Sequence, residues 1–177
     1  ITGSTGKTSL KNLLGETLNL YRSTYSSPRS YNNQYGVPLS LSNLKFSHKF
    51  GIFEIGMSNK GEINNLAKLV SPDLGIITNV GEAHIENFKN IHGIAKAKSE
   101  IINNIKKNGT LILKRDDIFF NFFKKKAIKN GLNLVTFGFS KNADVFPISH
   151  RSIGNLMVYK VKSFGKEYSF QTQNIRI

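Results

Sequence analysis

A glycine-rich stretch near the start of the chain has the composition of a phosphate-binding loop. Residues 3–8 read Gly-Ser-Thr-Gly-Lys-Thr, and a helical pattern follows them directly. Glycines let the backbone turn so that its N–H groups point at phosphate oxygens, and the N-terminus of the next helix adds partial positive charge. In such a loop the lysine reaches the β- and γ-phosphates and the threonine hydroxyl binds Mg²⁺. We therefore predict a nucleotide site formed by Gly3, Ser4, Thr5, Gly6, Lys7 and Thr8.

The match to the general phosphate-loop pattern is partial. That pattern, G-x-x-x-x-G-K-[ST], has a glycine where this chain has Ile1. An ordinary glycine–serine turn in front of a helix is the alternative interpretation. The pair of Lys7 and Thr8 favours the phosphate loop.

Further polar residues follow two apolar, strand-like runs. Glu54 lies within FGIFEIGM, and a carboxylate at the end of a buried strand is unfavourable unless it is paired or binds a metal. We predict that Glu54 binds Mg²⁺, with a salt bridge at the sheet edge as the alternative. Asn79, Glu82 and His84 follow the next strand, and His84 is either structural or part of the same site.

A lysine interrupts the apolar face of the helical segment IHGIAKAKSEIINNIKK. Lys98 lies on the stripe that contains Ile94 and Ile101, whereas Lys96 falls on the opposite, solvated face. One interpretation is that Lys98 extends its amine to the edge of the core. The other is that an uncharged amine takes up CO₂ and becomes a carbamate, an anionic oxygen ligand suited to Mg²⁺.

The elements that must position these residues alternate between strands and helices. We predict strands at 50–55, 74–78, 110–113 and 134–137, and helices at 9–21, 61–70, 91–107 and 119–130. This alternation predicts an α/β fold with a mostly parallel sheet flanked by helices. Residues 156–163 and 166–172 predict an antiparallel hairpin near the C-terminus. Ligands bind beyond the carboxyl ends of such strands, where Glu54 and Asn79 stand.

Composition limits the other classes of function. The 177 residues include no cysteine, which excludes a disulfide framework or a thiolate zinc site, and no apolar run approaches the roughly 18 residues of a membrane span. The net charge of +14 is spread along the chain without a concentrated patch. We therefore expect a cytoplasmic protein that binds neither membranes nor nucleic acids.

The ordered motifs resemble the central, ATP-binding domain of the Mur ligases, the ATP-dependent amino-acid and peptide ligases of cell-wall synthesis. ITGSTGKTS is similar to the family's T-G-[ST]-x-G-K-T loop, and FEIGMSNKGEI, ITNVGEAHIENF and IAKAKSEI are similar to three further motifs in the same order. YNNQYGVPLSL and GEAHIENF resemble the branch of the family that joins D-alanyl-D-alanine to UDP-N-acetylmuramoyl-tripeptide.

The resemblance implies a role for each motif. Residues 3–8 would hold the ATP phosphates, and Thr8 with Glu54 would hold one Mg²⁺. Lys98 matches the family's carbamylated lysine and His84 its metal-site histidine, both serving a second Mg²⁺. Lys7, Lys98 and His84 would be the catalytic residues.

Two more positions bear on the substrates. The resemblance implies that Asn33 faces the nucleotide-sugar substrate. In contrast, LKRDD departs from the family's L-N-x-D-D, because Lys114 stands where an asparagine is expected near adenine. That departure puts the adenine contact in doubt.

The implied reaction has two steps. The peptide carboxylate attacks the γ-phosphate of ATP to give an acyl phosphate and ADP, and the amine of D-alanyl-D-alanine then displaces phosphate. Lys7 and two Mg²⁺ ions would stabilise the charge on the phosphoryl group. The product serves peptidoglycan precursor synthesis.

The resemblance also implies a domain organisation. Residues 1–177 would be the central domain with its first strand truncated, and the UDP-sugar domain and the C-terminal domain would lie outside the chain. We expect the chain alone to be inactive and the protein to be a monomer. The alternatives are another Mur-type or folylpolyglutamate-type ligase, or a non-catalytic ATP-binding domain, which would have no use for Lys98 or His84.

Overall fold

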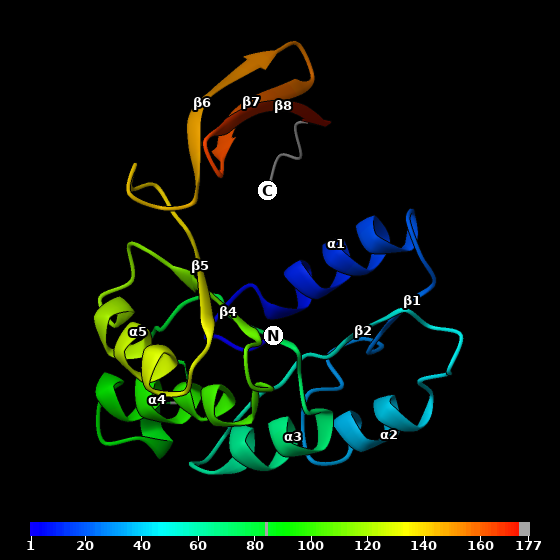
Figure 1. Cartoon of the computed structure of the whole chain (residues 1–177), viewed down its shortest axis with the longest axis vertical. Coiled ribbons are helices and arrows are strands. Elements are labelled where there is room, and N and C mark those ends of the chain that lie inside the picture. Colours follow the sequence, from blue (N-terminus) through cyan, green and yellow to red (C-terminus); the bar gives the residue numbers. More distant parts are fainter. Residues whose placement is uncertain (84, 174–177) are drawn as a thin grey trace.

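The computed structural model describes residues 1–83 and 85–173 of the chain. Figure 1 shows how its helices and strands are arranged. In chain order they are α1 (Lys7–Asn19), β1 (Thr24–Ser26), α2 (Gly36–Ser42), β2 (Phe50–Ile52), α3 (Glu62–Val70), β3 (Leu74–Ile77), η1 (Ile85–Asn87), α4 (Ile91–Lys98), η2 (Ser99–Asn104), β4 (Thr110–Lys114), α5 (Phe120–Lys129), β5 (Asn133–Phe137), β6 (Val145–Ile153), β7 (Leu156–Ser163) and β8 (Lys166–Gln173).

The strands form a parallel sheet that becomes antiparallel at one end. β1 pairs with β2 in parallel, and β3, β4, β5 and β6 are joined in that order by parallel pairs. β6, β7 and β8 then continue as an antiparallel meander. The prediction of an α/β fold with a mostly parallel sheet is therefore confirmed.

The first two residues join the two groups of parallel strands. The Ile55 N–H donates to the Ile1 carbonyl at 2.8 Å, and the Thr78 N–H donates to the Thr2 carbonyl at 3.0 Å. Residues 1 and 2 thus run between the chain that continues β2 and the end of β3. The phosphate-loop sequence consequently leaves the sheet from its interior.

Helices cover both faces of the sheet. One face packs Ile52, Ile76 and Ile112 against α1, and the other packs Leu111 and Leu113 against the helices that follow β2. In Figure 1, α1 lies on one side of the sheet and α2, α3, α4 and α5 lie on the other. Alternating strand residues therefore serve two cores. On α1 itself, Leu13 lies outside this core and is 62% exposed.

The helix predicted at 91–107 is shorter than expected. α4 ends at Lys98, and residues 99–104 tighten into the 3₁₀ helix η2. The Ser99 hydroxyl donates to the Lys96 carbonyl at 2.6 Å, a local bond that competes with regular helical bonding. The tighter turn still buries Ile101 and Ile102. It also directs the Glu100 carboxylate to the N–H groups of Gly61 and Asn64 at the start of α3.

The C-terminal hairpin is confirmed and forms part of a larger meander. β7 and β8 pair from Ser163 and Lys166 outward, and the turn residues Phe164 and Gly165 have φ values of 48° and 83°. Both values suit a type I′ turn. The sequence did not predict β6, β1 or α2, which lack a strong apolar period.

Candidate nucleotide-binding site

Two glycines give the phosphate loop its shape. Gly6 has φ 80° and caps the N-terminus of α1, whereas Gly3 has φ 148°. A Cβ atom at Gly3 would lie 1.9 Å from the Thr78 hydroxyl oxygen, so only glycine fits there. The loop therefore delivers its N–H groups to the start of α1, as a phosphate site requires.

Residues that follow β3 hold the loop in place. The Thr5 N–H donates to Asn79 Oδ1 at 3.1 Å, and Asn79 Nδ2 donates to Thr5 Oγ1 at 2.9 Å. The Thr78 hydroxyl donates to the Thr5 carbonyl at 2.6 Å. The structure thus brings Asn79 to the loop, as predicted, and leaves Glu82 exposed. His84 lies outside the described residues.

The lysine and threonine of the loop point to different partners. Lys7 Nζ donates to the carbonyls of Gly3 at 2.9 Å and Ser4 at 3.4 Å, so its ammonium lies over the loop. Thr8 Oγ1 donates to Glu54 Oε2 at 2.7 Å. The predicted pair of Thr8 and Glu54 is therefore in direct contact.

Glu54 is buried and held by neutral groups. It is 1% exposed, and its second oxygen accepts from Asn32 Nδ2 at 2.7 Å. Its hydrogen-bond partners in the described part of the chain are a hydroxyl and an amide, not the cation of a salt bridge. Hydroxyl and carboxylate oxygens side by side are the ligands that Mg²⁺ prefers.

The amine of Lys98 is inside the protein. Lys98 is 3% exposed, and its neighbour Lys96 is exposed as predicted. Burial, together with the smaller effect of the nearby charge of Lys7, lowers the pKa of Lys98 to about 8. A lysine extended to solvent would not be buried in this way. The geometry favours a lysine that is partly uncharged at neutral pH.

A second buried lysine was missed by the sequence analysis. Lys11 on α1 is 1% exposed, and its Nζ donates to the carbonyl of Ser27 at 2.6 Å and to that of Arg29. Burial lowers its pKa, and the charge of Glu54 opposes that effect. The sequence does contain an indication of this burial, because Lys11 interrupts the apolar face of the helix that contains Leu14. Lys98 was identified by the same kind of interruption.

Asn33 has a local structural role. Its Oδ1 accepts from the N–H groups of Tyr35 at 3.1 Å and Gly36 at 2.9 Å, at the start of α2. It is exposed, whereas the adjacent Asn32 contacts Glu54. Asn32 therefore supports Glu54, and Asn33 supports the start of α2. The predicted contact of Asn33 with a substrate stays a prediction.

A cavity of about 510 Å³ adjoins the phosphate loop. Its lining residues come from the loop and from the strands beside it, and they include Thr5, Gly6, Asn79, Lys114, Phe137, Phe139, Phe146 and Pro147. The rim residues 139 and 140 are fixed by their N–H groups, which donate to the Asp116 carboxylate. This cavity has the position and the apolar walls that suit a nucleoside attached to phosphates in the loop.

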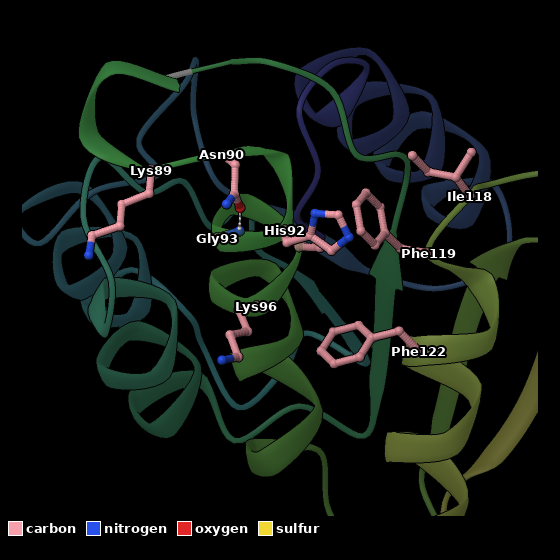
Figure 2. Close-up of a pocket in the computed structure, with 9 residues that line it drawn as sticks. Lys89, Asn90, His92, Gly93, Lys96, Ile118, Phe119 and Phe122 are labelled. Carbon is pink, nitrogen blue, oxygen red and sulfur yellow. Dashed lines mark hydrogen bonds between the residues drawn. The ribbon is translucent and has the colours of Figure 1, made fainter.

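A larger cavity lies elsewhere, between the starts of α4 and α5. It measures about 740 Å³ and shares no lining residue with the cavity beside the loop. Figure 2 shows the rings of His92, Phe119 and Phe122 together, with the amines of Lys89 and Lys96 directed away from them. His92 and Phe119 meet edge to face, with ring centroids 5.2 Å apart. The walls are apolar and hold no buried polar group that would orient a ligand.

The loop, the helix behind it and the parallel sheet define a P-loop-type nucleotide-binding domain. The family model of the Mur ligase middle domain matches residues 1–175. The chain therefore belongs to the Mur ligase family.

Curated relatives carry the name UDP-N-acetylmuramoyl-tripeptide–D-alanyl-D-alanine ligase. The one from Buchnera aphidicola (subsp. Acyrthosiphon pisum) is 41% identical over 141 residues, which are 80% of this chain and 30% of the relative. The one from Bacillus subtilis is 38% identical over 117 residues, 66% of this chain and 26% of the relative. The chain thus spans about a third or less of the length of these relatives.

Solved structures give the same assignment. MurF from Acinetobacter baumannii superposes with a TM-score of 0.89 at 29% identity, over 97% of this chain and 37% of that one. MurF from Thermotoga maritima in complex with ADP gives 0.86 at 28% identity, over 97% and 39%. The apo form of folylpolyglutamate synthetase (FPGS) from L. casei gives a TM-score of 0.70 at 12% identity, over 94% of this chain and 50% of that one, which shows a shared fold alone.

Within residues 1–83 and 85–173, no three His, Cys, Asp or Glu side chains are grouped so as to hold a metal ion. None of the helices in these ranges is long and apolar enough to cross a membrane.

Proposed function

We propose that this chain is the ATP-binding middle domain of a ligase that joins D-alanyl-D-alanine to UDP-N-acetylmuramoyl-tripeptide. The observation that carries the proposal is the contact of Thr8 with buried Glu54 beside a phosphate loop, in a chain whose curated relatives bear that ligase's name. The relative of known structure from Thermotoga maritima was crystallised with ADP. ATP therefore fits both the loop and the family.

The residues present fit Mg²⁺ at the loop. Thr8 Oγ1 and the Glu54 carboxylate are 2.7 Å apart at the N-terminus of α1, and both are hard oxygen donors. Bound Mg²⁺ would neutralise charge on the phosphate oxygens. Asn32, which donates to the other oxygen of Glu54, would keep that carboxylate oriented.

Lys98 suits a second cation if it is carbamylated. Reaction with CO₂ requires a neutral amine, and a pKa of about 8 leaves roughly a fifth of the amine neutral near physiological pH. The carbamate would convert a repulsion between Lys98 and Lys7 into an attraction, and would add anionic oxygens for Mg²⁺. The family's metal-site histidine corresponds to His84, which we propose as the partner of Lys98.

The proposed reaction follows from the way in which the phosphate loop and Lys7 bind the phosphates of ATP. N–H groups of residues 3–8 and the start of α1 bind the phosphates, and Lys7 turns from the loop carbonyls to the phosphate oxygens. A peptide carboxylate oxygen attacks the γ-phosphorus as its bond to the β–γ bridging oxygen breaks, which releases ADP. The amine of the dipeptide then attacks the acyl carbon, loses a proton and displaces phosphate.

Substrate contacts and the setting of the domain complete the proposal. The cavity beside the loop, with Lys114 on its wall, would take the nucleoside of ATP, and Asn33 would face the UDP-sugar. We place the chain in a cytoplasmic, monomeric ligase whose other domains bind the sugar nucleotide and the dipeptide. Folylpolyglutamate synthetase shares the fold only, so no observation favours that activity.

The test uses the full-length protein and a matched pair of lysines on α4. Phosphate release should require ATP, UDP-N-acetylmuramoyl-tripeptide and D-alanyl-D-alanine together. Lys98→Ala should lose turnover by about a hundredfold or more, and added formate or acetate should restore part of it by supplying an oxygen ligand. Lys98→Arg should stay inactive because a guanidinium cannot form a carbamate.

The control is Lys96→Ala, an exposed change two residues away on the same helix. It should leave turnover near that of the unmodified protein. Normal turnover in Lys98→Arg would rule out the carbamate, and turnover without the dipeptide would contradict the ligase itself.

A further inference from the structure

Buried Lys11 has no part in the chemistry proposed above. It lies one helical turn after Lys7 and three residues after Thr8, yet its ammonium points to the main chain of another segment. Burying an ammonium is unfavourable unless its N–H groups find acceptors. The carbonyls of Ser27 and Arg29 supply those acceptors. Lys11 therefore links α1 by hydrogen bonds to the chain that follows β1.

That segment, residues 27–33, forms one wall of the proposed metal site. Ser27 Oγ accepts the N–H of Glu54 at 3.3 Å, and Asn32 donates to the carboxylate of Glu54 at 2.7 Å. Ser30 Oγ lies 3.3 Å from Thr8 Oγ1. The segment therefore touches both residues proposed to bind Mg²⁺, and it ends at Asn33, the residue proposed to face the sugar nucleotide.

The backbone conformation of segment 27–33 needs support from a contact outside the segment. Arg29 has φ 47°, in the left-handed region that side chains other than glycine rarely adopt. The bond that its carbonyl accepts from Lys11 opposes relaxation of that conformation. The phosphate loop, in contrast, is held from the other side of the site by Thr78, Asn79 and Gly81.

We propose that Lys11 is a positioning residue that holds segment 27–33 against α1 and thereby sets the affinity for the sugar-nucleotide substrate, with little effect on nucleotide binding at the loop. The kinetic part of this inference rests on the proposed function. Its structural part concerns only contacts within the chain, so the two parts are tested separately.

The structural test is amide hydrogen exchange, read by mass spectrometry on peptides of the chain. The N–H groups of Ser27, Tyr31 and Asn32 have main-chain acceptors and should exchange slowly in the unmodified protein. Lys11→Met should speed exchange in residues 27–33 by about tenfold or more and leave β3 and β4 unchanged. Lys11→Gln keeps a polar group in the buried site, and it carries the test if Lys11→Met does not fold.

The matched control is Lys68→Met, which removes an exposed lysine from α3. Its exchange pattern should equal that of the unmodified protein. A uniform increase over the whole chain in the Lys11 variants, or no increase in residues 27–33, would overturn the positioning role.

The kinetic test uses the full-length protein and separates the two substrates. In Lys11→Gln, KM for UDP-N-acetylmuramoyl-tripeptide should rise about tenfold, while the Kd for ADP stays within about twofold. An equal rise in the KM for UDP-N-acetylmuramoyl-tripeptide and in the Kd for ADP would contradict the inference. Unchanged kinetic constants with only a lowered Tm would contradict it as well. If the unmodified protein has no ligase activity, the proposed function fails, and the exchange experiment still decides the role of Lys11.

Discussion

Three lysines near the phosphate loop have different roles because their surroundings differ. Lys7 lies over the loop and is available to phosphate oxygens, Lys11 is bonded to two main-chain carbonyls, and Lys98 is buried at the end of α4. Only the first is visible as a motif. Burial and hydrogen-bond partners distinguish the other two.

At the residue scale, Lys7→Ala should weaken ADP binding to the chain by about tenfold and lower turnover of the full-length protein by about a hundredfold or more. The larger effect on turnover follows because charge accumulates on the transferring phosphoryl group. Isothermal titration with ADP and a phosphate-release assay measure the two effects. If Lys7→Ala binds ADP and turns over as the unmodified protein does, the loop is an ordinary turn and not a phosphate site.

The buried amine of Lys98 should also destabilise the fold. Its pKa falls from 10.5 to about 8, which corresponds to about 3 kcal/mol of lost stability at neutral pH. The folded state loses this proton near pH 8 and the unfolded state near pH 10.5, so the contribution of Lys98 makes stability rise with pH across that window.

Lys98→Met should therefore raise the free energy of unfolding at pH 7 by up to about 3 kcal/mol and lack the rise between pH 8 and 10.5. Urea unfolding in CO₂-free buffer at pH 7 and pH 10 measures the difference between the two proteins. A variant that is less stable at pH 7 would show that the buried charge is compensated.

At the element scale, the β7–β8 hairpin contains an unfavourable turn residue. Phe164 is 66% exposed with φ 48°, a conformation that asparagine adopts far more readily. Phe164→Asn should stabilise the protein by about 0.5–1 kcal/mol, because it relieves backbone strain and sacrifices little buried area. Thermal unfolding checks this, and Gly165→Ala, at φ 83°, should lower the Tm.

At the scale of the whole molecule, the chain spans about a third of the length of its relatives. We expect the 177 residues alone to bind ADP weakly and to release no ADP from ATP when both peptide substrates are added. A coupled assay for ADP measures this. Release that depends on both substrates would show that this domain suffices for catalysis.

The sequence by itself determined the phosphate loop, the alternation of strands and helices and the inward position of Lys98. These features depend on local residue types and on the apolar period of a helix, both of which a single chain displays. The C-terminal hairpin was equally readable, because its alternating residues flank a two-residue turn.

Only the tertiary structure decided how distant segments meet. Residues 1 and 2 enter the sheet between strands that are far away in sequence, and Lys11 finds its acceptors 16 and 18 residues away. The contact of Thr8 with Glu54 spans 46 residues, and it was expected from the family resemblance and not from a local pattern. Local patterns carry no information about such pairs, because the sheet's strand order, and not the sequence spacing, brings their elements together.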